Sequence, residues 1–152
     1  MTTDYGGEIV RRFWEEVFGR SETSAMDEMF AVHYRLHDLV HRETHDLEEV
    51  KSIVWNSHNM MPGARVVVDD QNLTEDGRVF TRFTVHVPSP PDAEPSEQSA
   101  PPGEGWRYNG MSLSRLVEGE IAESWIVWEA IRAEQELGPY FEGPRWRWPP
   151  WR

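Results

Sequence analysis

The sequence contains no cysteine at any of its 152 positions. This absence excludes disulfide bonds, thiolate metal ligands and thiol nucleophiles. The sequence also lacks any run near the roughly 18 consecutive apolar residues that cross a bilayer, and its first residues lack the apolar stretch of a secretion signal. We therefore expect a soluble cytoplasmic protein without a membrane partner.

Basic residues are scarce as well. The chain has 15 lysines and arginines against 27 aspartates and glutamates, which gives a net charge of −12. This charge opposes binding to nucleic acid, because such binding depends on basic side chains that displace counterions from phosphates. The glycine patterns of nucleotide-binding loops are also missing, so we expect neither a nucleic-acid partner nor a cofactor.

The length suits one domain over residues 1–152. Apolar residues three and four positions apart predict amphipathic helices over 7–18, 24–33 and 46–56. Alternation and β-branched residues predict strands over 64–68, 78–87, 106–117 and 121–128, before a last helix over 129–137. Helices followed by hairpin strands indicate an α+β fold.

Two segments fall outside these predicted elements. Residues 88–105 are rich in proline, which predicts a long loop insertion and a candidate lid for a pocket. Residues 139–152 alternate tryptophan and arginine between prolines, so a regular helix is excluded. We expect Trp146, Trp148 and Trp151 to pack on the rim of the subunit or on a second copy in a homodimer.

Glu129 lies among apolar neighbours, which are Trp125, Ile126, Val127 and Trp128 on one side and Ala130 and Ile131 on the other. If these neighbours bury its carboxyl group, the lost hydration raises its pKa toward the range of a general acid or base. Strand alternation places Trp125 and Val127 on the same face as Glu129, with Trp128 on the other. The alternative is a first-turn acid stabilised by the dipole of the last helix.

Four segments in chain order resemble the SnoaL-like polyketide cyclase family, and the resemblance implies a core over about residues 8–138, interrupted by the proline-rich loop. Residues 13–31, FWEEVFGRSETSAMDEMFA, are similar to its first two helices, and residues 35–38, RLHD, are similar to its V-x-H-D segment. Residues 60–70 resemble F-P-D-x-R-V-x-V-x-D, and residues 110–130 resemble G-x-D-I-F-R-x-x-D-G-K-I-x-E-x-W-x-x-W-D.

The resemblance implies the nuclear transport factor 2 type of fold, in which N-terminal helices wrap a curved antiparallel sheet into a cone that holds the ligand. In the family, an aspartate at the end of the last strand acts as acid and base during ring closure. That position falls on Glu129 in this sequence. The resemblance also implies a pocket-facing His37, and related ketosteroid isomerases point to Asp38 as the rival acid or base.

His33, His37, His41 and His45 recur every four residues, a spacing that would stack four imidazoles on one helix face and favour a metal ion. The segment 39–44 corresponds to a loop in the family, and no H-E-x-x-H pattern is present. We therefore predict no metal site.

Further residues are candidates for binding the substrate. Trp14 and Tyr34 could stack on a flat ligand, although helical spacing equally fits a core role. Arg82 and His86 share one strand face, so both reach the cavity or both lie outside. Tyr108 and Asn109 face opposite ways, so only one can enter. The predicted substrate-binding set is Trp14, Tyr34, Arg82, His86, Tyr108, Trp125 and Val127.

These features and the resemblance predict a cofactor-free cyclase of secondary metabolism, such as antibiotic biosynthesis. It would close a ring in a polyketide-derived small molecule by an aldol, oxygen-heterocycle or cycloaddition reaction. Glu129, Asp38 and His37 are the catalytic candidates. Two alternatives stay open: an isomerase or epoxide hydrolase of the same fold, and a non-catalytic ligand-binding or carrier module. For the hydrolase, residues 107–109 offer Arg-x-Asn where Arg-x-Asp is needed.

Overall fold

The structure is a computed structural model that describes residues 3–18, 22–88 and 105–137. The predicted proline-rich loop, except Pro88 and Gly105, and the aromatic tail with Trp146, Trp148 and Trp151 lie outside the described residues.

Helices occupy both ends of the described chain. The helical elements are α1 (Thr3–Arg12), a π-helical segment (Phe13–Phe18), a 3-10 turn (Thr23–Ala25), α2 (Met26–Met29), α3 (Leu47–Met60) and α4 (Ala130–Glu136). Asp46 is the N-cap of α3, because its side chain accepts the Glu49 N–H at 2.9 Å. The Glu49 carboxylate in turn accepts the Asp46 N–H, and this reciprocal pair fixes the start of the helix. No helix among the described residues is long and apolar enough to cross a membrane.

The strands form one six-stranded sheet in the order β2-β1-β6-β5-β4-β3. Their bounds are β1 (Phe30–Asp38), β2 (Glu43–Asp46), β3 (Arg65–Leu73), β4 (Val79–Val87), β5 (Trp106–Val117) and β6 (Glu120–Trp128). The predicted α+β class is confirmed. The sheet is mixed, however, because β1 and β6 run parallel while the other neighbouring pairs are antiparallel.

The helix predicted over 24–33 is wrong after Met29, because β1 begins at Phe30. Val32 and Tyr34 favour extended backbone over a helix. In the strand, His33 is exposed to solvent.

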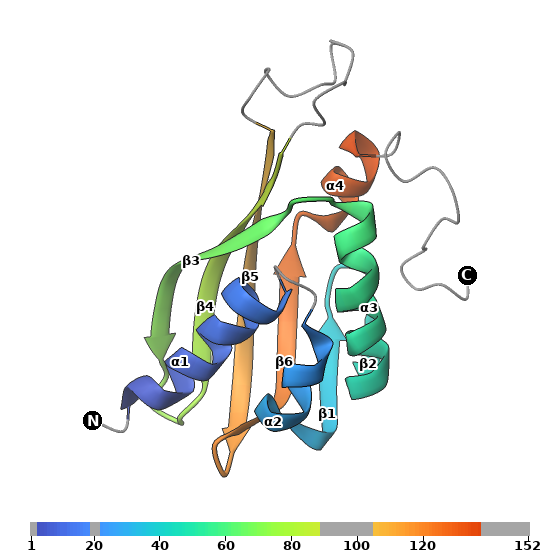
Figure 1. Ribbon diagram of the computed structural model, residues 1–152. Coiled ribbons are helices and arrows are strands. Elements are labelled where there is room, and N and C mark those ends of the chain that lie inside the picture. The colour runs from blue at the N-terminus through green and yellow to red at the C-terminus, as the bar shows by residue number, and fades with distance from the viewer. Residues whose placement is uncertain (1–2, 19–21, 89–104, 138–152) are drawn as a thin grey trace.

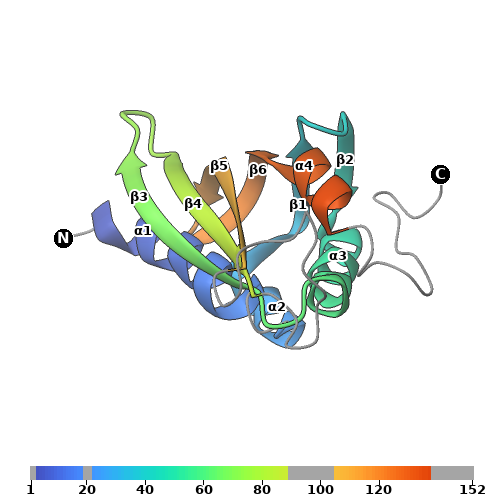
Figure 2. The same cartoon turned by 90° about the horizontal axis from the view of Figure 1, so that it is seen from above.

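The sheet is strongly curved, with α1, α2 and α3 packed on its concave side (Figures 1 and 2). Alternation along β4 turns Thr81, Phe83 and Val85 toward this side, where all three are buried. Alternation along β5 does the same for Ser112 and Ser114. The concave face therefore carries the core together with a few hydroxyl groups.

Candidate functional site

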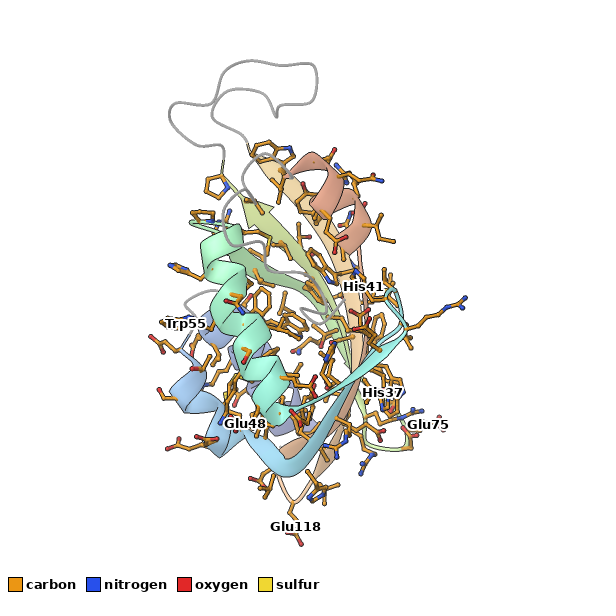
Figure 3. All side chains as sticks on the ribbon, turned by 90° about the vertical axis from the view of Figure 1, so that its right-hand side faces the viewer. His37, His41, Glu48, Trp55, Glu75 and Glu118 are labelled. Atoms are coloured by element: carbon orange, nitrogen blue, oxygen red, sulfur yellow. The ribbon has the colours of Figure 1, made fainter. Side chains whose placement is uncertain are left out.

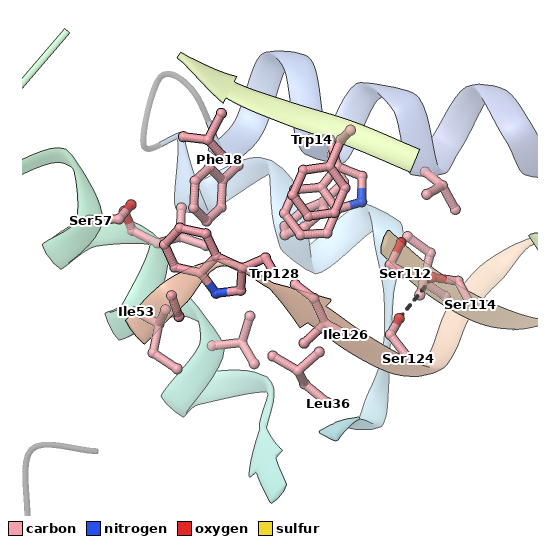
Figure 4. Close-up of a pocket in the computed structure, with 18 of the residues that line it drawn as sticks. Trp14, Phe18, Leu36, Ile53, Ser57, Ser112, Ser114, Ser124, Ile126 and Trp128 are labelled. Carbon is pink, nitrogen blue, oxygen red and sulfur yellow. Dashed lines mark hydrogen bonds between the residues drawn. The ribbon is translucent and has the colours of Figure 1, made fainter. Parts of the chain in front are cut away.

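A cavity lies between the concave face of the sheet and the helices (Figure 4). Aromatic side chains supply much of its wall: Phe13, Trp14, Phe18, Phe30, Tyr34, Phe83 and Trp128. Polar side chains interrupt this apolar wall at a few points: His41, Ser57, Ser112, Ser114, Ser124 and Glu134. An apolar pocket with a few polar groups has the composition of a small-molecule site.

Trp14 is held in the wall by a stacked contact with Phe83, whose ring centroid lies 4.1 Å away. The Phe83 ring takes this place because Gly110 leaves room beside it on β5. A Cβ atom at Gly110 would overlap the Phe83 ring and would lie 2.9 Å from Trp128 Cβ. The missing side chain thus shapes the cavity.

The cavity also contains an imidazole held between two carboxylates. His41 Nδ1 lies 2.8 Å from Asp38 Oδ2, and His41 Nε2 lies 3.1 Å from Glu134 Oε1. Asp38 is buried at the end of β1, and its other oxygen accepts the backbone N–H groups of Val40 and His41. His41 therefore occupies a fixed position in the turn after β1 (Figure 3).

Within this cluster, the His41 imidazole and its carboxylate partners stabilise each other's charged forms. Hydrogen bonds to Asp38 and then to Glu134 raise the pKa of His41 to about 9, against the opposing effect of burial. Burial alone would raise the pKa of Asp38, but its hydrogen bonds with His41 outweigh this effect and lower the value. At neutral pH the cavity thus contains an imidazolium ion paired with carboxylates.

Glu129 lies outside the cavity, and the expected rise of its pKa is wrong. Its Oε1 atom accepts the Asn109 backbone N–H at 2.8 Å and the Asn109 side-chain amide at 3.0 Å. Its Oε2 atom lies 3.0 Å from an Arg132 nitrogen. The Asn109 backbone N–H and then Arg132 lower the pKa of Glu129, because these donors stabilise its charged form.

Trp125 and Val127 face outward, so the expectation that they line the cavity is wrong. Alternation does place the two on one side, but it is the outer side of the sheet, where Val127 is 47% exposed. The cavity wall takes Ser124, Ile126 and Trp128 from β6 instead. The prediction that Trp125 and Val127 share a face was correct, but the assignment of that face to the cavity was wrong. Alternation along a strand fixes which residues share a face and leaves open which face is buried.

His37 also lies on the outer side and not in the cavity. Its Nε2 atom lies 2.7 Å from Glu123 Oε2, its Nδ1 atom lies 3.2 Å from Thr44 Oγ1, and its ring stacks on Trp125. Figure 3 shows His37 on β1, away from His41 in the following turn. Asp38, the next residue, faces the opposite way by alternation and is the one that meets His41.

Arg82 and His86 share a face as predicted, and that face lies outside the cavity. Arg82 lies 3.7 Å from Asp69 and 3.4 Å from Asp70 on β3. Partial burial and then Arg65 and Arg107 lower the pKa of His86. Neither residue belongs to the cavity wall.

Tyr108 points to the concave side, while Asn109 points away from it. Tyr108 is fully buried, and the Arg132 guanidinium lies 5.2 Å from its ring centre. Its ring contacts Arg132 of α4 and is not part of the cavity wall. Trp14 and Tyr34 do line the cavity. A contact of these two residues with substrate stays a prediction.

The four evenly spaced histidines do not stack, because β1, a turn and β2 separate them instead of one helix. His45 is buried beside Glu49 at 3.2 Å, while His33 is exposed. Within residues 3–18, 22–88 and 105–137, no group of three His, Asp or Glu side chains is placed to hold a metal ion.

A family model described as the SnoaL-like domain matches residues 10–124 of the chain. The chain belongs to the SnoaL-like domain family. This result confirms the resemblance found in the sequence. A search of curated proteins gave no match to this SnoaL-like domain.

Solved structures share the fold of this SnoaL-like domain at low sequence identity. IdmH, a candidate polyketide cyclase from Streptomyces antibioticus, has a TM-score of 0.69 at 17% identity, over 88% of this chain and 98% of its own. A candidate polyketide cyclase from Acidithiobacillus ferrooxidans has a TM-score of 0.68 at 16% identity, over 90% and 96%. AclR from Streptomyces galilaeus, a candidate hydroxylase, has a TM-score of 0.61 at 18% identity, over 81% and 88%.

Sequence reasoning did not place His41 in the cavity and did not single out Glu134. The signal for His41 was its place three residues after Asp38, a spacing that lets a carboxylate cap the following turn. Glu134 is 93 residues away from His41 in the chain. Its helix had a clear pattern, but nothing local indicates which of its acids faces the cavity.

Proposed function

We propose that this SnoaL-like domain is a cofactor-free cyclase that closes a ring in an apolar, polyketide-derived substrate by acid and base catalysis. The observation that carries this proposal is the His41 imidazole, fixed between buried Asp38 and Glu134 at the wall of a largely apolar cavity. The neighbouring folds described as candidate polyketide cyclases support the same substrate class.

His41 and Glu134 supply the acid and the base in this proposal. Their reacting atoms, Nε2 and Oε1, are 3.1 Å apart, so both can reach one substrate. In an aldol closure, the Glu134 carboxylate takes a proton from the carbon next to one carbonyl. The carbon nucleophile then forms a bond to a second carbonyl carbon, and His41 gives its Nε2 proton to the oxygen of that carbonyl.

Asp38 acts through His41 as a positioning residue. Its carboxylate keeps the imidazole charged and directs Nε2 toward the cavity. After ring closure, the proton held by Glu134 returns across the 3.1 Å contact to His41, which restores the starting state. Glu129 and His37 take no step, because their polar atoms are already engaged outside the cavity.

An aryl-substituted 1,5-diketone tests the proposal, because its closure to a conjugated cyclohexenone releases one water molecule and is followed by ultraviolet absorbance. A panel with poly-β-ketone thioesters extends the test to longer substrates. We expect acceleration over buffer that depends on His41. Binding without acceleration for every member of the panel would favour the carrier alternative.

We further propose that the outer face of the sheet joins two copies in a homodimer. Met111 and Val127 are cross-strand partners on this face, and they are 50% and 47% exposed. Exposed neighbouring apolar side chains are typical of interaction surfaces. The cytoplasmic location expected from the sequence stays a prediction.

A further inference from the structure

The floor of the cavity carries a row of hydroxyl groups that the proposed acid and base steps do not use. Ser112 and Ser114 come from β5 and Ser124 from β6, and all three are buried on the concave face (Figure 4). Serine weakens a strand in comparison with β-branched residues. Three serines in the middle of a buried sheet therefore invite a reason beyond folding.

The hydrogen bonds of these groups account for two of the three serines. Ser114 Oγ and Ser124 Oγ lie 2.9 Å apart, and Ser124 is also hydrogen-bonded to Tyr34. Ser57, at another part of the wall, donates to the Val54 carbonyl at 2.7 Å. Ser112 differs, because its Oγ atom is buried and has no hydrogen-bond partner among the described residues.

An unpaired buried hydroxyl destabilises the protein without a ligand, and an alanine at the same place would avoid this cost. A ligand that supplies the missing hydrogen bond removes this cost when it binds. The described residues of the cavity wall include no lysine or arginine, and the charge of His41 is already paired with Asp38 and Glu134. A neutral oxygen therefore fits the position of Ser112 better than an anionic one.

We propose that Ser112 donates a hydrogen bond to a carbonyl or hydroxyl oxygen of the ligand, and that this contact selects oxygenated over plain hydrocarbon ligands. The inference rests on the proposed function in one respect, since it describes the substrate of the same cavity. Beside Ser112 lies the hydrogen-bonded row of Ser114, Ser124 and Tyr34. Its hydroxyl groups can reorient when Ser112 binds the ligand oxygen.

Strand register gives the place of the ligand oxygen relative to the acid. Ser112 on β5 pairs with Ile126 on β6, and Ile126 pairs with Asp38 on β1. Two strand spacings of about 4.8 Å each thus separate Ser112 from Asp38, or roughly 10 Å. We therefore assign Ser112 to a different ligand oxygen from the carbonyl oxygen that His41 protonates in the proposed reaction.

The test compares two bicyclic probes of similar shape, 1-tetralone with one carbonyl and tetralin with none. Their dissociation constants are measured by calorimetry and by quenching of the cavity tryptophans in the full-length protein. The wild type should bind tetralone more tightly by about three- to tenfold, the range of one hydrogen bond. Ser112→Ala should lose this preference.

Ser57→Ala is the matched control, because it removes a cavity hydroxyl that is already bonded to Val54. It should keep the preference for tetralone. Thermal unfolding of Ser112→Ala should occur at the wild-type temperature or above it, since the variant removes an unpaired polar group. A lower temperature would show that the hydroxyl already has a structural partner and would overturn the proposal.

An equal preference in Ser112→Ala and wild type would overturn the proposal, and so would a wild type that prefers neither probe or binds neither. The cyclisation assay separates this outcome from failure of the proposed function. If tetralone preference depends on Ser112 while no diketone is cyclised, the oxygen subsite stands and the cavity serves binding alone.

Discussion

Asp38 contacts His41 at two points. One carboxylate oxygen accepts the His41 backbone N–H at 3.0 Å, and the other lies 2.8 Å from the ring atom Nδ1. The turn after β1 and the orientation of the imidazole are therefore fixed by the same buried side chain. This double contact makes Asp38 and His41 one structural unit, and it leaves the Nε2 atom as the reactive one.

Replacing Asp38 with asparagine should lower the pKa of His41 toward its ordinary value, because the negative charge next to Nδ1 is lost. In a plot of activity against pH, the fall in activity on the alkaline side should then move from about pH 9 toward neutrality. NMR titration of the His41 ring and the pH dependence of kcat measure both effects.

Glu123→Gln is the matched control for that variant, because Glu123 lies 2.7 Å from His37 in a similar pair on the outer side. This variant should leave the pH dependence of the activity unchanged. Equal shifts in the two variants would mean that the effect comes from net charge and not from the cavity.

Stability should depend on pH through the same pair. The pKa of His41 is raised from 6.5 to about 9 in the folded state, so its contribution is complete below about pH 6.5 and is lost as the pH rises through about 9. The pKa of Asp38 is lowered from 3.8, so its contribution is present above that value and is lost as the pH falls through the lowered one.

Denaturant unfolding at several pH values measures this dependence. The free energy of unfolding should fall by on the order of 1–3 kcal/mol between about pH 6 and pH 10. His41→Gln should flatten that part of the curve. An unchanged slope in the variant would contradict a raised pKa of His41.

Gly110→Ala should destabilise the fold by about 1–3 kcal/mol, because the added methyl group forces the Phe83 ring out of its stack with Trp14. Urea unfolding with tryptophan fluorescence reports both the stability and the surroundings of Trp14. Gly7→Ala is the matched control, since a Cβ atom added there meets only the end of the flexible Gln71 side chain. A Gly110→Ala variant as stable as the control would show that the wall can rearrange freely.

Met111→Glu tests the proposed homodimer. A carboxylate on the outer face would be desolvated on association and would oppose it, so the variant should sediment as a monomer where the wild type sediments as a dimer. Ile131→Glu, which places the same charge at an exposed apolar position of α4 outside the sheet, is the control. A monomeric wild type at high concentration would contradict this part of the proposal.

The order of elements was largely predictable because their patterns are local. The Asp46 cap, the turn at residues 75–77 and the two long strands of the C-terminal hairpin follow from short-range chemistry. The strand from Phe30 was missed, because its first residues continue the apolar spacing of the preceding helix. Residue propensity alone could not decide between a longer helix and a strand over these residues.

The candidate site was less predictable, since it depends on which face of each strand is concave. Trp125 and Val127 share a face with each other, but nothing in β6 itself says whether that face meets the helices. The contact between His41 and Glu134 joins a turn near the start of the chain to the last helix. Glu129 illustrates the same limit, since its apolar neighbours in sequence are not its neighbours in space.

The rate of diketone cyclisation by wild type, His41→Gln and Glu129→Gln tests the assignment of the acid most directly. His41→Gln keeps a polar side chain without an imidazolium proton, and its rate should fall by at least about 100-fold. Glu129→Gln should stay within about threefold of wild type, because its side-chain oxygen can still accept the Asn109 N–H. A large loss in Glu129→Gln with wild-type rates in His41→Gln would contradict the assignment.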